Sequence, residues 1–221
     1  MFTRQLLSKK RSTIEWCLTK AVVESLEDRC FLSGSTVYVD QSATGNQSGM
    51  DWADAFTHLQ SALAAAAADS PSASNFVAIE VAEGTYVPGT EATDTFQLVG
   101  NTSIKGGYAP GGSAMPNPSE CPTILSGGGF NSTVLTSGPT ASGASLNGLT
   151  ISGSSGVNAF GGGLLVSYGN VTVNDCTFSD NTALCGGGIY IDANSSATIT
   201  NCAFRTVNPA FIRPIQSPAT S

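Results

Sequence analysis

The sequence has unusually few charged side chains. Only 11% of its 221 residues are Asp, Glu, Lys or Arg, whereas a typical soluble domain has about 25%. A long helical bundle needs Glu and Lys on its solvent faces, so this composition disfavours that class. The hydrophobic fraction of 41% is nevertheless that of a folded protein. The composition therefore predicts a β-rich protein whose surface is solvated by hydroxyls, amides and turns.

Positive charge is scarce in most of the chain. Residues 1–33 hold six of the nine Lys and Arg residues and carry a net charge of +2, whereas the rest of the chain carries −9. Between Arg29 and Arg205 the only cation is Lys105. Surfaces that bind nucleic acid or anionic lipid need several cations to neutralise phosphates. The composition excludes both kinds of partner for the body of the chain.

Long apolar runs are also missing. No stretch reaches the roughly 18 apolar residues of a membrane-spanning helix, and the alanine run at 64–68 is far shorter. Residues 1–33 begin with basic side chains, but the apolar core of an ordinary signal peptide does not follow. We therefore expect no transmembrane segment, and we interpret 1–33 as a leader that is disordered or removed.

Residues 23–33, VESLEDRCFLS, resemble the LEPR-XLL motif at the N-terminus of large exported planctomycete-type proteins. Asp28 stands where the motif has Pro, and Phe31 stands where it has Leu. The resemblance implies export or display at the cell surface. The other interpretation of this segment is a short amphipathic helix without a targeting role.

One segment has the periodicity of an amphipathic helix. Apolar residues recur at helical spacing over 52–66, Asp51 is a suitable N-cap, and Pro71 ends the pattern. The spacing predicts a helix over about 51–69. His58, the only histidine, falls on the polar face, so we expect a solvated residue and not a base or a ligand.

The rest of the chain is a series of short apolar runs separated by glycine, with internal repeats. Strands are predicted at 36–40, 76–81, 95–99, 103–108, 123–125 and 133–135. Three octets, ASLNGLTI, VTVNDCTF and ATITNCAF, begin at 144, 171 and 197, and GGGLLV at 161 recurs as GGGIYI at 186. A period of 25–27 residues that contains several short strands is typical of a parallel β-solenoid.

Each octet predicts two strands joined by a corner. Positions one, three, six and eight are apolar or small, and a polar or glycine pair lies between them. Equivalent inward residues then stack at the spacing of adjacent strands, about 4.8 Å, and the triple glycines form tight corners. The residues predicted to carry this repeat are Gly161, Gly162, Gly163, Cys176, Phe178, Asn181, Gly186, Gly187, Gly188, Cys202 and Phe204.

These residues also carry a family resemblance. FSDN at 178–181, followed by GGGI at 186–189, resembles the FxxN and GGAI pair of polymorphic outer-membrane-protein repeats. Residues 36–204 are similar to the N-terminal portion of bacterial right-handed parallel β-helix repeat proteins, in which an amphipathic helix caps the first coil. The resemblance implies an all-β, right-handed parallel β-helix with a leader at 1–33, a cap at 34–71, coils at 72–204 and an irregular tail at 205–221.

The same pectin lyase-like fold hosts polysaccharide lyases and hydrolases. Their chemistry needs convergent carboxylates with a nearby cation, or an acidic calcium cluster. The repeats offer Asp175, Asp180 and Asp192, which the octet alignment assigns to different faces. We therefore expect no catalytic, cofactor or metal site. The alternative is a polysaccharide-active or carbohydrate-binding β-helix protein.

The cysteines do not form a metal or redox motif, because no CxxC spacing occurs. Cys176 and Cys202 are stacked equivalents whose side chains point the same way, which suits burial better than a disulfide. The tail contains Pro209, Pro214 and Pro218, which forbid another regular coil there. We expect that this sequence is the N-terminal part of a longer β-helix protein.

The function that these observations favour is an exported or cell-surface module, in the outer membrane or secreted, with a structural or adhesive role. Its partner is predicted to be a surface protein or a polysaccharide, and no cofactor is expected.

Overall fold

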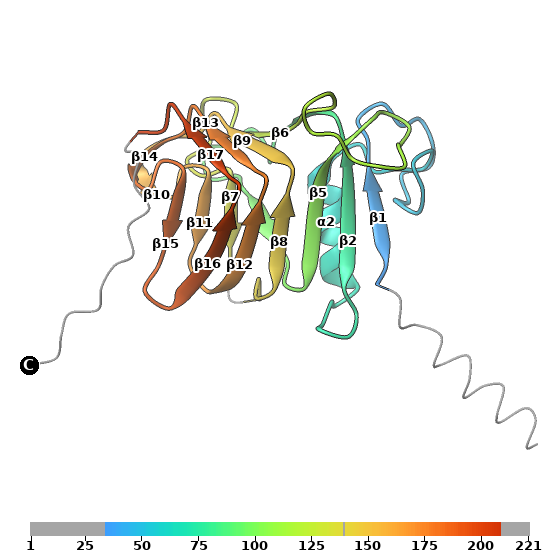
Figure 1. Ribbon diagram of the computed structural model, residues 1–221, viewed down its shortest axis with the longest axis horizontal. Coiled ribbons are helices and arrows are strands. Elements are labelled where there is room, and N and C mark those ends of the chain that lie inside the picture. Colours follow the sequence, from blue (N-terminus) through green and yellow to red (C-terminus); the bar gives the residue numbers. More distant parts are fainter. Residues whose placement is uncertain (1–33, 139, 209–221) are drawn as a thin grey trace, which may run out of the picture. The chain divides into compact units, whose positions relative to one another are not determined.

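The computed structural model describes residues 34–138 and 140–208. Within these ranges the chain forms 17 strands and one α-helix, and the strands wind into a right-handed parallel β-helix (Figure 1). The predicted leader at 1–33 and residues 209–221 of the predicted tail lie outside the described residues.

Three long sheets form the walls of the β-helix. The first sheet contains β1 (Thr36–Val39), β2 (Val77–Ala82), β5 (Thr102–Tyr108), β8 (Ala144–Asn147), β12 (Gly169–Asn174) and β16 (Ser195–Thr200). The second contains β3 (Gly84–Tyr86), β6 (Thr123–Ser126), β9 (Leu149–Ser152), β13 (Thr177–Ser179) and β17 (Ala203–Arg205). The third contains β4 (Phe96–Leu98), β7 (Leu135–Ser137), β11 (Leu164–Val166) and β15 (Ile189–Ile191). A short fourth sheet pairs β10 (Ser155–Phe160) with β14 (Thr182–Cys185).

The strand register confirms the repeat read from the sequence. Val171 pairs with Ala144 on one side and with Ala197 on the other, and Phe178 pairs with Ile151 and Phe204. The glycine-rich element follows the same rule, because Leu164 pairs with Ile189. Each octet therefore crosses from the first sheet to the second at one corner.

The core consists of stacked inward side chains. Ile79, Ile104, Leu146 and Val173 occupy one such ladder, one in each successive coil, and all are fully buried. Ile199 continues the ladder in the last coil and is only partly buried. The alternation of inward apolar and outward polar residues is what gives this low-charge chain both a core and a solvated surface.

The corner between the first two sheets requires left-handed backbone. Gly148, Asp175 and Asn201 have φ of 63°, 52° and 53°, and they stack from coil to coil. Gly, Asn and Asp are the residues that adopt this conformation at least cost. This explains the polar or glycine pair in the middle of each octet.

The helix starts later than the sequence predicted. Helix α2 spans Leu59–Ala68 with the exposed His58 at its N-cap, and not Asp51. Asp51 closes a turn instead, because its Oδ1 accepts a bond of 2.8 Å from the Asp54 N–H, and Phe56 bridges to Val39. The buried face of α2 packs against β1, β2 and β4. The helix thus covers the core of the first coil, where later coils have a strand of the third sheet.

Candidate functional site

The three repeat-region carboxylates lie at three different corners. Asp175 lies between β12 and β13, Asp180 between β13 and β14, and Asp192 between β15 and β16. Asp175 and Asp180 adopt left-handed backbone, and Asp192 Oδ1 accepts a bond of 2.7 Å from the Ala193 N–H. The structure therefore does not bring these groups together, and their local role is to shape turns.

The outer faces of the coils carry rows of amides and hydroxyls. Thr200 Oγ1 donates to Asn174 Oδ1 over 2.7 Å on the first sheet, and Ser142 Oγ donates to Asn170 Oδ1 over the same distance near the start of β8 and β12. Such bonds join neighbouring coils side chain to side chain. The outer faces are mainly polar and carry few charges, among them the neighbouring residues Glu80 and Lys105 on β2 and β5.

Asn181 is a buried polar anchor of the repeat. Its side chain is fully buried, its Nδ2 donates to the Ile151 carbonyl over 2.9 Å, and its Oδ1 accepts from the Ser154 N–H over 3.2 Å. These bonds satisfy the backbone of the preceding coil at a corner where the ladder of strands is interrupted. Asn181 therefore stabilises the fold and is not available to a ligand.

The triple glycines have two distinct structural causes. Gly161 and Gly186 adopt left-handed backbone, with φ of 68° and 63°. The other glycines lie against neighbouring backbone or rings, since a Cβ on Gly163 would approach the Gly188 carbonyl oxygen to 2.6 Å. Gly162, Gly187 and Gly188 have similar contacts. Close packing of coils, and not ligand binding, accounts for these glycines.

The cysteines behave as small apolar groups. Cys176 is 1% exposed and Cys202 is partly buried; both are free thiols. Burial raises the pKa of the Cys176 thiol to about 12, so this group is an uncharged thiol at neutral pH.

A hollow of about 390 Å³ lies beside the residues that follow β1 and is lined by two acidic residues, Asp40 and Glu83. Asp40 is 2% exposed. Its carboxylate accepts bonds from the Ser42 N–H and hydroxyl at 2.7 and 2.6 Å and from the Gly111 N–H at 2.7 Å. The sequence did not indicate this site, because Gly111 is distant in the chain. Asp40 joins two loops, and the negative charges disfavour a uronate in this hollow.

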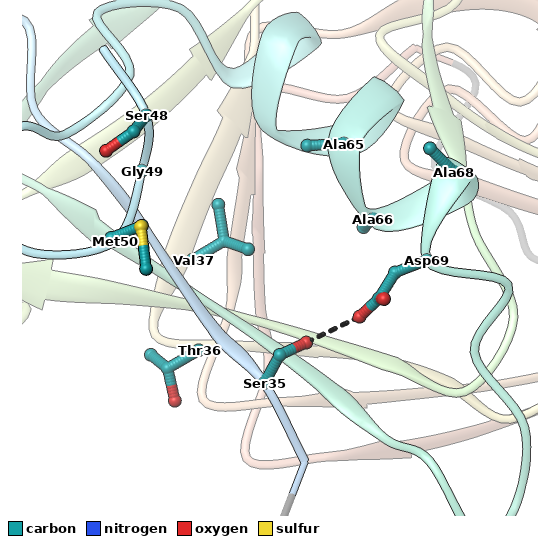
Figure 2. A pocket seen from close by; sticks show the side chains of 10 residues that line it. All are labelled: Ser35, Thr36, Val37, Ser48, Gly49, Met50, Ala65, Ala66, Ala68 and Asp69. Carbon is teal, nitrogen blue, oxygen red and sulfur yellow. Dashed lines mark hydrogen bonds between the residues drawn. The ribbon is translucent and has the colours of Figure 1, made fainter. Parts of the chain in front are cut away.

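A second hollow, of about 560 Å³, opens between β1 and the C-terminal half of α2 (Figure 2). Its lining is mainly apolar or backbone and includes Val37, Met50 and Ala66. Asp69 is its single charged residue, and Asp69 Oδ2 accepts a bond of 2.8 Å from Ser35 Oγ. The hollow therefore offers a mainly apolar surface that suits weak contacts.

Comparison with known proteins agrees with this geometry. Residues 126–212 match the family model of the right-handed beta helix region. No curated protein and no solved structure matched the chain. The matched range begins at the last residue of β6 and includes every octet and the repeated glycine triplets at 161–163 and 186–188, so the right-handed beta helix is supported by sequence and structure together.

One cluster of aromatic side chains lies among the loops of the first coils. Trp52 lies between Tyr38 and Tyr108, with ring centroids 4.9 and 5.3 Å away and the rings tilted. These neighbours limit the access of a sugar ring to Trp52, whereas Tyr168 is 50% exposed. A more accessible group lies on the fourth sheet, where Val157, Phe160 and Leu184 are 64%, 43% and 54% exposed.

Two further properties concern the described part of the β-helix alone. No three His, Cys, Asp or Glu side chains gather there in a way that suits a metal ion. Its helix α2 is not long and apolar enough to span a membrane.

Proposed function

We propose that this chain is an exported or cell-surface β-helix module with a structural or adhesive role and without catalytic activity. The observation that carries the proposal is the separation of Asp175, Asp180 and Asp192 onto three corners. Polysaccharide hydrolysis or elimination requires an acid and a base within reach of one bond. Lys105 and Arg205 are the only Lys or Arg residues among the described residues. Arg205 lies one coil from Asp180, whose N–H donates to the Arg205 carbonyl over 3.2 Å, but no second carboxylate shares that corner.

The surface supports contact with a macromolecule more than binding of a small ligand. The coils present rows of Thr, Ser and Asn, and the fourth sheet adds Val157, Phe160 and Leu184 as exposed apolar side chains. Exposed apolar groups rimmed by polar residues are typical of protein-contact surfaces. A surface protein is therefore the first partner to test and a polysaccharide the second.

Export rests on the resemblance of residues 23–33 to the LEPR-XLL motif. Its test is to express the chain in a bacterium that exports proteins of this kind, with and without residues 1–33, and to locate the protein by fractionation. Equal distribution of the two forms would contradict an export role for the leader.

The absence of catalysis is tested by incubating the folded full chain with polygalacturonate, alginate and a neutral glucan, with and without calcium. We expect no new reducing ends and no unsaturated uronate above the level of the heat-unfolded protein. Turnover by the folded protein alone would overturn the proposal and establish the competing function, a polysaccharide-active enzyme. Retention of one polysaccharide without turnover would identify it as the adhesive partner.

A further inference from the structure

The outer face of the first sheet carries one polar side chain per coil, in register. On β2 and β5, Ile79 and Ile104 point into the core and are fully buried. Because side chains alternate along a strand, the next residues, Glu80 and Lys105, point outward. The strands of this sheet lie side by side in Figure 1. The register aligns a set across them that we call the polar row: Glu80, Lys105, Asn147, Asn174 and Thr200.

The charges within the polar row cancel. Glu80 is its one acid and Lys105 its one base, and the other three side chains are uncharged. The chain after residue 33 carries a net charge of −9, so a polyanion is repelled by the molecule as a whole. A carboxylate, an ammonium and amides side by side supply both acceptors and donors. The polar row therefore suits a neutral ligand that is rich in hydroxyl groups.

The middle of the polar row has unused hydrogen-bonding capacity. Lys105 and Asn147 are partly buried neighbours on β5 and β8. Within residues 34–138 and 140–208, no hydrogen bond or ion pair joins either side chain to another group. The ammonium offers three donors, and the amide offers two donors and an acceptor. Farther along, Asn174 already accepts a bond of 2.7 Å from Thr200. A ligand would therefore bind chiefly at Lys105 and Asn147.

An aromatic side chain borders the acidic end of the polar row. Tyr38 on β1 pairs with Glu80, is partly exposed, and packs against Trp52 with ring centroids 4.9 Å apart. Burial, and then the neighbouring Glu80 carboxylate, raise the pKa of the Tyr108 hydroxyl, so this group stays protonated at neutral pH. A sugar ring that bonds to Glu80 thus has an apolar ring beside it, and such a combination suits carbohydrate.

The spacing of the polar row discriminates between kinds of polymer. Neighbouring coils are about 4.8 Å apart. An extended peptide advances about 3.3 Å per residue and an α-helix about 1.5 Å, so a peptide laid along the row falls out of step with it. One hexose unit of an extended β-1,4-linked glucan has nearly the length of one coil spacing. An α-linked glucan such as amylose coils and does not keep this period.

We propose that the outer face of the first sheet binds an extended, neutral β-1,4-linked glucan along the polar row. Lys105 and Asn147 donate to sugar hydroxyls, and Glu80 accepts from one. The strands already hold these side chains in register, so binding costs little conformational entropy. This inference rests on the proposed function, because it gives the polysaccharide partner a class and a site.

The test is binding of the folded full chain to amorphous cellulose and to cellohexaose, with amylose and polygalacturonate as comparison ligands. We expect retention on cellulose and weaker retention on the other two. Lys105→Ala and Asn147→Ala should each lower the affinity for cellohexaose at least about tenfold. Thr150→Ala is the matched control, because Thr150 is a partly buried, outward residue of β9 in the same coil as Asn147, and it should bind like the unmodified chain.

Nuclear magnetic resonance of the unmodified chain gives a measurement that does not depend on a variant. The side-chain amide signals of Asn147 should shift as cellohexaose is added. Failure to bind cellulose, equal binding of amylose, unchanged Asn147 signals, or full affinity in both row variants would each overturn this inference alone. Release of new reducing ends from cellulose would overturn the proposed non-catalytic function and this inference with it.

Discussion

At the scale of single residues, Asn181 shows how a buried amide stabilises a coil. It bonds to the Ile151 carbonyl and to the Ser154 N–H, and it is fully buried. Asn181→Ala removes both bonds and takes from the buried Ser154 N–H its side-chain partner, and the loss of such a partner costs about 1–3 kcal/mol. We expect the free energy of unfolding, measured in urea, to fall by about 2–4 kcal/mol. The exposed Asn158→Ala is the control, and an equal effect of both variants would contradict this role.

Gly163 tests the close approach of neighbouring coils. A Cβ at this position would lie 2.6 Å from the Gly188 carbonyl oxygen and 2.7 Å from the Phe178 ring. Because neither group can move easily, Gly163→Ala should destabilise the protein by about 1–3 kcal/mol. At Gly138 the nearest group is the end of the flexible Gln97 side chain, at 3.0 Å. Gly138→Ala should therefore change the denaturant midpoint far less, and the opposite ranking would refute the packing argument.

Cys176 makes stability depend on pH in the alkaline range. Burial raises the pKa of its thiol to about 12, whereas a thiol in the unfolded chain ionises near pH ~8.5. Above that pH, unfolding releases a proton, so the free energy of unfolding falls by up to about 1.4 kcal/mol per pH unit. The contribution is fully present below pH ~8.5 and is lost as the pH rises towards 12. Cys176→Ala should show a shallower decline between pH ~8.5 and ~10 in urea titrations, and parallel curves would contradict the assignment.

At the scale of elements, repeated strands could be predicted far better than the cap. The octets and triple glycines were located correctly, because stacking forces equivalent residues to share one environment. The start of the helix was wrong, because Trp52 and Phe56 fit a helical period but pack elsewhere. Trp52 inserts between Tyr38 and Tyr108. Tyr108 lies far along the sequence from both of the other residues. Such contacts leave no local pattern, and the Asp40–Gly111 bond was missed for the same reason.

The cap contributes to stability through the buried face of α2. Leu63 is 4% exposed and belongs to the same core as Leu59 and Ile79. Leu63→Ala should lower the free energy of unfolding by about 2–5 kcal/mol, the usual cost of such a truncation in a core. Gln60→Ala lies on the exposed face of the same helix and should change it by less than about 0.5 kcal/mol. If Leu63→Ala left the thermal midpoint unchanged, α2 would not be the cover of the first coil.

At the scale of the whole molecule, low charge and high glycine content have the same structural cause, the repeated coil. The glycines and Asn or Asp residues make the corners, and Thr, Ser and Asn cover the outer walls, so few positions remain at which charges can gather. Stability in such an array is close to a sum over coils and their interfaces. A coil in the middle has two neighbours and the last coil has one, and this difference can be measured with the same substitution at two positions.

Ile151 and Ile199 provide that comparison. Ile151 is fully buried in an inner coil, and Ile199 is a partly buried core residue of the last coil. Ile151→Ala should lower the free energy of unfolding by about 2–5 kcal/mol, and Ile199→Ala should lower it by less than half as much, because Ile199 is only partly buried. Urea unfolding of the two variants measures both costs, and equal costs would contradict the difference in burial between the two positions.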